Sequence, residues 1–237
     1  MRISLPMLAA FALMSCSTGP MELSPSTTSA PHWGEKPRTR LVEANSVYSQ
    51  QLPDARVHLP KGARYLGSTR FDLKDVVDAE IHLFVEANEE RVVERAYWIQ
   101  FESYLPEYPD AAYDFMDDGM PLASLGDMEL FYRARFGRAE DVPPEGSEAQ
   151  RVQQMIADAG YELPAETFSA QFHQVVSADN RSEILVIVIG DLAQLDLSFA
   201  QIVAGGRQEE PMKRLSEKAL PVAQKTVRIR SPVRSAR

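Results

Sequence analysis

Two histidines and two acidic residues are the side chains of this chain that are best suited to acid–base chemistry. His82 and His173 lie on segments whose pattern predicts strands, and the other two histidines are far from them in sequence. If the fold brings these strands together, the imidazoles beside Glu102 or Asp179 would form a site for general acid–base catalysis, built from distant positions as in many hydrolases. The alternative is that both histidines are ordinary polar residues of a sheet surface.

A second group of residues is suited to recognition. The stretch 97–119 combines aromatic with acidic residues and is opened by prolines after a predicted strand. Aromatic side chains in a loop offer a large, stiff contact area at a small cost in entropy, which favours binding of a ligand or partner. We therefore expect a binding surface formed by Trp98, Tyr104, Tyr108 and Tyr113. The alternative is that the tyrosines pack the loop onto the sheet while the acids face water.

Metal and cofactor chemistry is not indicated. The spacing of Asp114 and Asp117 departs from the D-x-D-x-D-G pattern of a calcium loop, and the zinc-binding patterns H-E-x-x-H and paired cysteines do not occur. Phosphate-binding loops, the G-x-G-x-x-G fingerprint and the G-x-S-x-G nucleophile elbow are also missing from the sequence. The sequence therefore predicts no metal, no cofactor and no catalytic residue.

A group of arginines follows the aromatic stretch. These residues could receive the carboxylates of the acidic loop or bind an anionic ligand, because the guanidinium fork suits both. We expect internal ion pairs. The group consists of Arg133, Arg135, Arg138 and Arg151.

Apolar periodicity predicts the elements that position these side chains. Alternation of apolar and polar residues predicts strands, and the continuous apolar run 184–190 predicts a central strand covered on both faces. Polar turns join two pairs of strands into hairpins. The pattern predicts an α+β fold, a single domain with a mostly antiparallel sheet of about six strands packed by two or three helices. The predicted strands are 65–73, 80–87, 92–105, 128–136, 167–176 and 184–190, and the predicted helices are 147–160, 192–203 and 209–220.

Composition and charge narrow the class of protein. The chain has 237 residues, a formal net charge of −9 and an isoelectric point near 5.0. Such an acidic chain is not expected to bind nucleic acid, which usually needs a basic face. A single cysteine excludes an intramolecular disulfide, so a hydrophobic core must stabilise the fold.

That cysteine closes a short apolar run at the N-terminus. Arg2 precedes residues 3–14, a run too short to span a bilayer and typical of the apolar region of a signal peptide. The run ends in Leu13-Met14-Ser15-Cys16, which resembles the lipobox of bacterial lipoproteins. The resemblance covers residues 1–16 and implies cleavage before Cys16 and acylation of its sulfur and new amino group, for instance with palmitate. An ordinary cleaved signal peptide and a buried apolar N-terminus are the alternatives.

The sequence therefore divides into four parts. Residues 1–15 are predicted to be a lipoprotein signal peptide, 16–51 a lipidated disordered tether, 52–222 the α+β domain, and 223–237 a basic disordered tail. The tether is rich in Ser, Thr and Pro, as is typical of disordered spacers. Ser17 replaces the aspartate that marks inner-membrane retention in enteric lipoproteins, which favours the outer membrane.

The functional expectation follows from the anchor and from the missing catalytic motifs. We expect a periplasm-facing lipoprotein of the bacterial cell envelope, held at a membrane through Cys16, with a non-enzymatic domain that binds or scaffolds an envelope protein partner or another ligand. Two alternatives remain open. One is an envelope hydrolase with a site built from the histidines and acids, and the other is a carrier with an apolar cavity between sheet and helices.

Overall fold

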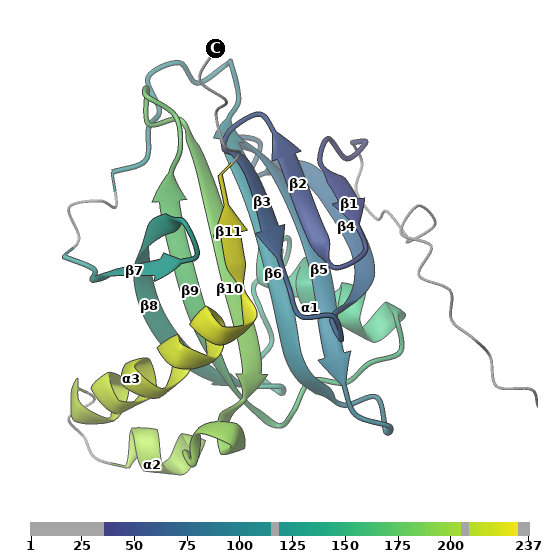
Figure 1. The fold of residues 1–237 in the computed structure, drawn as a ribbon, viewed down its shortest axis with the longest axis vertical. Helices are drawn as coiled ribbons and strands as arrows, with labels where there is room; N and C mark the ends of the chain where they lie inside the picture. Colours follow the sequence, from purple (N-terminus) through teal and green to yellow (C-terminus); the bar gives the residue numbers. More distant parts are fainter. Residues whose placement is uncertain (1–35, 115–118, 205–208, 232–237) are drawn as a thin grey trace, which may run out of the picture.

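Two antiparallel sheets, of seven and four strands, form the body of the protein in a computed structural model that describes residues 36–114, 119–204 and 209–231 (Figure 1). The larger sheet has the strand order β4-β5-β6-β10-β9-β8-β7, and the smaller has the order β1-β2-β3-β11. The larger sheet consists of β4 (Arg64–Leu73), β5 (Val77–Ala87), β6 (Val93–Tyr104), β7 (Leu122–Leu125), β8 (Met128–Arg138), β9 (Glu166–Val175) and β10 (Ser182–Asp191). The smaller consists of β1 (Leu41–Glu43), β2 (Ser46–Gln50), β3 (Asp54–His58) and β11 (Arg228–Arg230).

Three helices and one short 3₁₀ turn complete the described part of the chain. Helix α1 spans Glu148–Asp158, α2 spans Phe199–Val203 and α3 spans Glu209–Thr226, while the turn η2 covers Leu192–Leu195. Ser147 caps α1 as its position predicts, with its side chain accepting a hydrogen bond from the amide of Gln150.

The two predicted hairpins form the centre of the large sheet. Strand β5 pairs with β6, β9 pairs with β10, and β10 also pairs with β6, so that β10 lies in the middle of the sheet. Its residues are almost all buried, which confirms the prediction for the apolar run 184–190. Alternation along β6 defines two faces: the inner face carries Tyr97, Ile99 and Phe101, and the outer face carries Trp98, Gln100 and Glu102.

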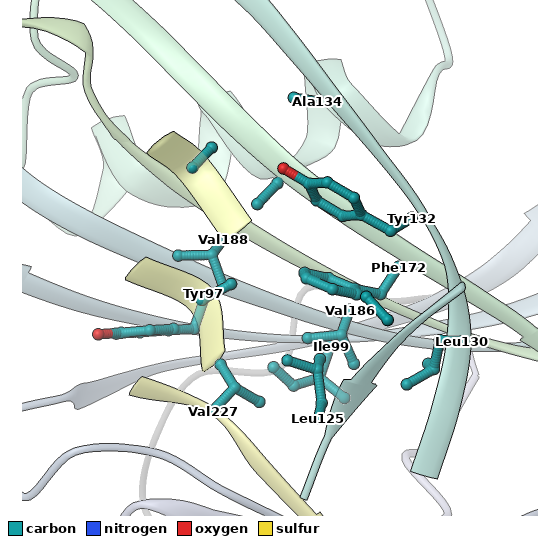
Figure 2. Close-up of a cluster of buried hydrophobic side chains, with 14 of the residues drawn as sticks. Tyr97, Ile99, Leu125, Leu130, Tyr132, Ala134, Phe172, Val186, Val188 and Val227 are labelled. Atoms are coloured by element: carbon teal, nitrogen blue, oxygen red, sulfur yellow. The ribbon is translucent and has the colours of Figure 1, made fainter. Parts of the chain in front are cut away.

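The inner face holds the main core. The four-stranded sheet and α3 lie over it in Figure 1, and their buried residues join the side chains of β6, β8, β9 and β10 in one cluster. Leu215, Ala219 and Ala223 are the buried residues of α3. Figure 2 shows how the side chains of Tyr97, Val188 and others from the sheet pack around α3, so packed side chains fill the space between these layers.

The outer face is covered over only part of its width. Helix α1 lies behind β4, β5 and β6 in Figure 1, and its Val152, Met155 and Ile156 pack on outer-face residues of those strands. Towards β8 the outer face becomes accessible. There Gln171 and Arg133 are half-buried and Arg135 is exposed. The outer face of the described sheet is therefore accessible at β8 and β9.

Two expected boundaries of the domain were wrong. Residues 41–50, assigned to the tether, form β1 and β2, and the chain from Lys36 already packs against the large sheet. At the other end α3 continues through Pro221 to Thr226, and β11 pairs with β3, so residues 223–230 belong to the folded domain rather than to the basic tail. The signal peptide, Cys16, the tether up to residue 35 and the tail from residue 232 lie outside the described residues.

The α+β class and the antiparallel pairing are confirmed. The prediction of a single sheet of about six strands was wrong, because the described residues form two sheets. The predicted helix 192–203 is also interrupted. Asp196 takes a left-handed conformation with φ of 51° between η2 and α2, and Ser198 begins α2 with a capping box. Among the described residues, no helix is long and apolar enough to cross a membrane.

Candidate functional site

A buried pair of carboxyl groups lies on the outer face of the large sheet. Glu102 of β6 and Glu183 of β10 are directly opposite each other in the antiparallel pairing. Only 7% of Glu102 and 5% of Glu183 is exposed. Carboxylates are almost never buried without compensation, because desolvation of a charge costs several kcal/mol. Two such groups side by side are therefore the most unusual feature of this face.

Polar side chains of β6 and of the following loop hold Glu102 in place. Trp98 donates its indole N–H to Oε1 of Gln100 at 2.6 Å, and Gln100 in turn donates from Nε2 to Oε1 of Glu102. The hydroxyl of Tyr113 donates to Oε2 of Glu102 at 2.9 Å. Because Trp98, Gln100 and Glu102 alternate along one strand, they form a continuous row on the outer face.

Strands β9 and β8 place a histidine and an arginine on the other side of the pair. Nδ1 of His173 lies 3.9 Å from Oε2 of Glu183, and only 9% of His173 is exposed. Arg133, one strand further, donates from Nε to Oε1 of Gln171 at 2.9 Å. We call Glu102, Glu183, His173 and Tyr113 the outer-face cluster.

The charges of the outer-face cluster depend on one another. Burial, together with the charge of Glu183, raises the pKa of Glu102 to about 8, and burial raises the pKa of Glu183 to about 7. Two adjacent carboxyl groups whose pKa values are both raised hold a proton between them near neutral pH. Burial and the positive charge of Arg133 lower the pKa of His173 to about 4, so its imidazole is neutral.

His82 belongs to a different network, on the inner face. Its Nε2 is 2.9 Å from Oε1 of Glu80, and its Nδ1 is 3.1 Å from the hydroxyl of Tyr65. Since a carboxylate only accepts, Nε2 carries the proton and Nδ1 accepts from Tyr65. Glu80 also accepts hydrogen bonds from the backbone and side chains of Thr39 and Arg40. These hydrogen bonds hold Thr39 and Arg40, which precede β1, against the large sheet.

The structure therefore separates the two histidines of the expected hydrolase site. His82 is opposite Ile99 on the inner face, whereas His173 is opposite Leu185 on the outer face. Three strand spacings, about 14 Å, and the thickness of the sheet lie between them. Asp179 is in the β9–β10 turn, where its carboxylate accepts from the amide of Arg181. Of the four residues proposed for that site, the fold brings together only Glu102 and His173.

The aromatic residues predicted to bind a ligand divide into two groups. Trp98 and Tyr113 belong to the polar row that ends at Glu102. Tyr104 packs against Tyr113 in a tilted arrangement with 4.7 Å between ring centroids, and Tyr108 is 40% exposed. The loop that carries them is fixed by Arg181, whose guanidinium donates to the backbone carbonyls of Tyr104, Leu105, Tyr108 and Ala111. The loop thus packs on the sheet and also contributes to the outer-face cluster.

The arginines do not form one group. Arg138 pairs with Glu140 and Asp141, and Arg151 stacks on Phe71 with its guanidinium carbon 3.8 Å from the ring centroid. Only Arg133 and Arg135 lie on the outer face of β8. In the part of the chain that the structure describes, no group of three or more histidine, cysteine or acidic side chains is arranged to hold a metal ion.

Sequence reasoning missed Glu183. The residue stands just before the apolar run 184–190, where an acid is ordinarily read as the polar end of a strand. The signal that could have found it is the alternation itself, which places Glu183, Leu185 and Ile187 on one face.

Comparison with known proteins adds no relative, because no family model, no curated protein and no solved structure matches the chain.

Proposed function

We propose that this protein is a lipid-anchored lipoprotein of the bacterial cell envelope whose folded domain binds a ligand or an envelope partner at the outer face of the large sheet. The lipobox resemblance at Leu13-Met14-Ser15-Cys16 supports the anchor, and the domain would face the periplasm, with the outer membrane favoured. The binding domain would need neither a cofactor nor nucleic acid.

The observation that supports binding best is the outer-face cluster. The outer face of the large sheet carries a buried row of polar groups next to the accessible strands β8 and β9. Buried carboxyl groups with raised pKa values are costly for stability and are typical of functional sites. Trp98 and Tyr113, expected from the sequence to contact a ligand, take part in this row.

Replacement of Cys16 by serine is expected to release the protein from the membrane. Two or more acyl chains hold a protein at a bilayer, and serine offers no sulfur to acylate. The native protein should fractionate with membranes, and its mass should match cleavage before Cys16 plus diacylglycerol and fatty acid. Intact Met1 or an unmodified Cys16 in the native protein would contradict the anchor.

A photo-crosslinking residue placed at Arg135 is expected to capture the binding partner or ligand in living cells. Arg135 is exposed on the outer face of β8, beside the cluster. The matched control is Val142, which is 89% exposed in the loop before α1. A product that forms at position 135 and fails to form at position 142 supports the proposal. Equal products at both positions, or none at Arg135, would count against a binding surface there.

A hydrolase is the second candidate, because the shared proton gives the outer-face cluster one acid and one base. Glu102 could protonate a leaving group while Glu183 takes a proton from water. A carrier of an apolar ligand has less support, since side chains fill the space between the large sheet and α3 (Figure 2).

A further inference from the structure

The outer-face cluster contains a buried hydrogen-bond acceptor, Oε2 of Glu183, that lacks a nitrogen or hydroxyl donor in the described part of the chain. Oε2 of Glu183 is buried, and among the described residues no nitrogen or hydroxyl group donates a hydrogen bond to it. The carboxyl group of Glu102 hydrogen-bonds to Glu183, and it can donate only while it is protonated. His173 approaches only to 3.9 Å, too far for a hydrogen bond. Buried carboxylate oxygens in folded proteins nearly always have a donor. When the pair loses its shared proton, no donor therefore remains for Oε2 of Glu183 among the described residues.

We propose that Glu102 and Glu183 bind the primary ammonium group of an aliphatic amine, an inference that rests on the proposed binding function of this face. The ammonium group has three N–H donors and no acceptor. One N–H would supply the missing bond to Oε2 of Glu183, and another would take the place of the proton that the two carboxyl groups share. One proton leaves the pair as one ammonium binds, so the charge of the cluster is conserved.

The neighbouring residues suit an alkyl chain attached to that ammonium group. Leu185 and Ile187 follow Glu183 on the same face of β10, and Trp98 lies opposite Ile187 on β6. These three side chains keep 8%, 6% and 8% of their surface exposed, and Trp98 and Ile187 share a buried cluster with α1, so a methylene chain could cover only the small apolar surface that α1 leaves accessible. The carboxyl pair thus has apolar side chains beside it on the same face of the sheet.

The surrounding charges favour a cation at the pair and limit where it can lie. Glu148 at the start of α1 acts electrostatically on both carboxyl groups, which adds negative charge. The net charge of −9 attracts cations over longer distances. Arg133 and Arg135 repel a cation, so the ammonium group is confined to the β6–β10 side. The titratable or charged groups around the pair are Tyr104, Tyr113, Glu148, His173, Arg133, Arg135 and Arg181.

The test is calorimetric titration of the full-length protein with butane-1,4-diamine, with lysine amide acetylated on its α-amino group, and with butane-1,4-diol. Both amines are expected to bind and the diol is not. Binding should tighten by up to about tenfold per pH unit between pH 6 and pH 8, because the ammonium group displaces a proton. Glu183→Gln should weaken amine binding at least about tenfold by removing the charge. Glu129→Gln, which removes an exposed carboxylate on β8, is the control and should have no effect.

The outcomes separate this inference from the proposed function. Equal binding of the diol and the diamine, or amine binding that does not change with pH, overturns the ammonium site. Crosslinking at Arg135 without any amine binding overturns the ammonium site and leaves the binding face standing. If Glu183→Gln does not fold, Glu102→Gln replaces it, and unchanged amine affinity in that variant is also a negative result. Binding of the free diamine without the lysine amide identifies a small molecule rather than a lysine side chain as the ligand.

Discussion

Replacement of Glu80 by alanine is expected to lower the free energy of unfolding by about 4 kcal/mol, since removal of one partner from a buried, hydrogen-bonded ion pair leaves the other uncompensated. Only 1% of Glu80 is exposed, and its carboxylate accepts from His82, Thr39 and Arg40. Without it, the guanidinium of Arg40 and the imidazole of His82 lose their acceptor in the space between the two sheets. The measurement is equilibrium unfolding in urea at pH 7.

The contribution of Glu80 also has a defined pH dependence. Burial alone would raise the pKa of Glu80, but the hydrogen bond from His82, the donors of Thr39 and the charge of Arg40 outweigh burial and hold this pKa well below its usual range. A carboxyl group whose pKa is lower in the folded state stabilises the protein above its unfolded-state pKa, and the stabilisation is lost as the pH falls. The difference between the native protein and Glu80→Ala should therefore shrink below about pH 4.

A control separates this effect from the general loss of an ion pair. Glu43 pairs with Arg56 at 2.8 Å on the surface, where 63% of the glutamate side chain is exposed. Glu43→Ala should change the unfolding free energy by less than about 1 kcal/mol. A loss of similar size in both variants would show that Glu80 is no more than a surface charge.

The sequence predicted those parts of the fold whose signal lies within one segment. Apolar patterns within single segments identified β4, β5, β6, β8 and β9, the continuous apolar run 184–190 identified β10, and the capping residue Ser147 identified the start of α1. The small sheet escaped prediction because its strands have three to five residues each and β11 pairs with a strand near the other end of the chain. Three residues carry too little periodicity to be distinguished from a loop.

The candidate site was predictable only in part, for a reason that concerns pairing. Alternation places Glu102 and His173 on strands, but their meeting depends on β6 and β9 both pairing with β10. That order is set by the packing of the whole sheet. The same limit explains why His82 was expected beside His173. A single sequence does not show which face of the β5–β6 hairpin lies on the same side of the sheet as a given face of the β9–β10 hairpin.

Two buried glutamates of one sheet thus have opposite electrostatic surroundings. Glu80 faces donors and a positive charge, which makes its ionised form favourable. Glu102 faces another carboxyl group across the β6–β10 pairing, which makes its ionised form unfavourable. The first arrangement stabilises the fold at neutral pH, whereas the second weakens it. A feature that weakens the fold is more readily explained by a role in binding than by a role in folding.

Replacement of Glu102 by glutamine is therefore expected to stabilise the protein, by about 3 kcal/mol at pH 8. The pKa of Glu102 rises from an ordinary value near 4.5 to about 8 through burial and the charge of Glu183. A carboxyl group with a raised pKa is tolerated in its protonated form at low pH, and stability falls as the pH rises towards the folded-state pKa. Glutamine has the shape of the neutral acid, can donate to Glu183, and never ionises.

The stabilisation should depend on pH in a way that identifies its cause. At pH 5 Glu102 is protonated in the native protein, so the variant should gain less than about 1 kcal/mol there, and the gain should grow through pH 6 to 8. Urea unfolding at several pH values measures this profile. Asp179→Asn, which removes an exposed acid whose pKa is lowered by hydrogen bonds from Ser177 and Arg181, should show no gain at pH 8. A gain in unfolding free energy for Glu102→Gln that is the same at every pH would indicate better packing rather than removal of a charge. It would contradict the interpretation that Glu102 and Glu183 share a proton.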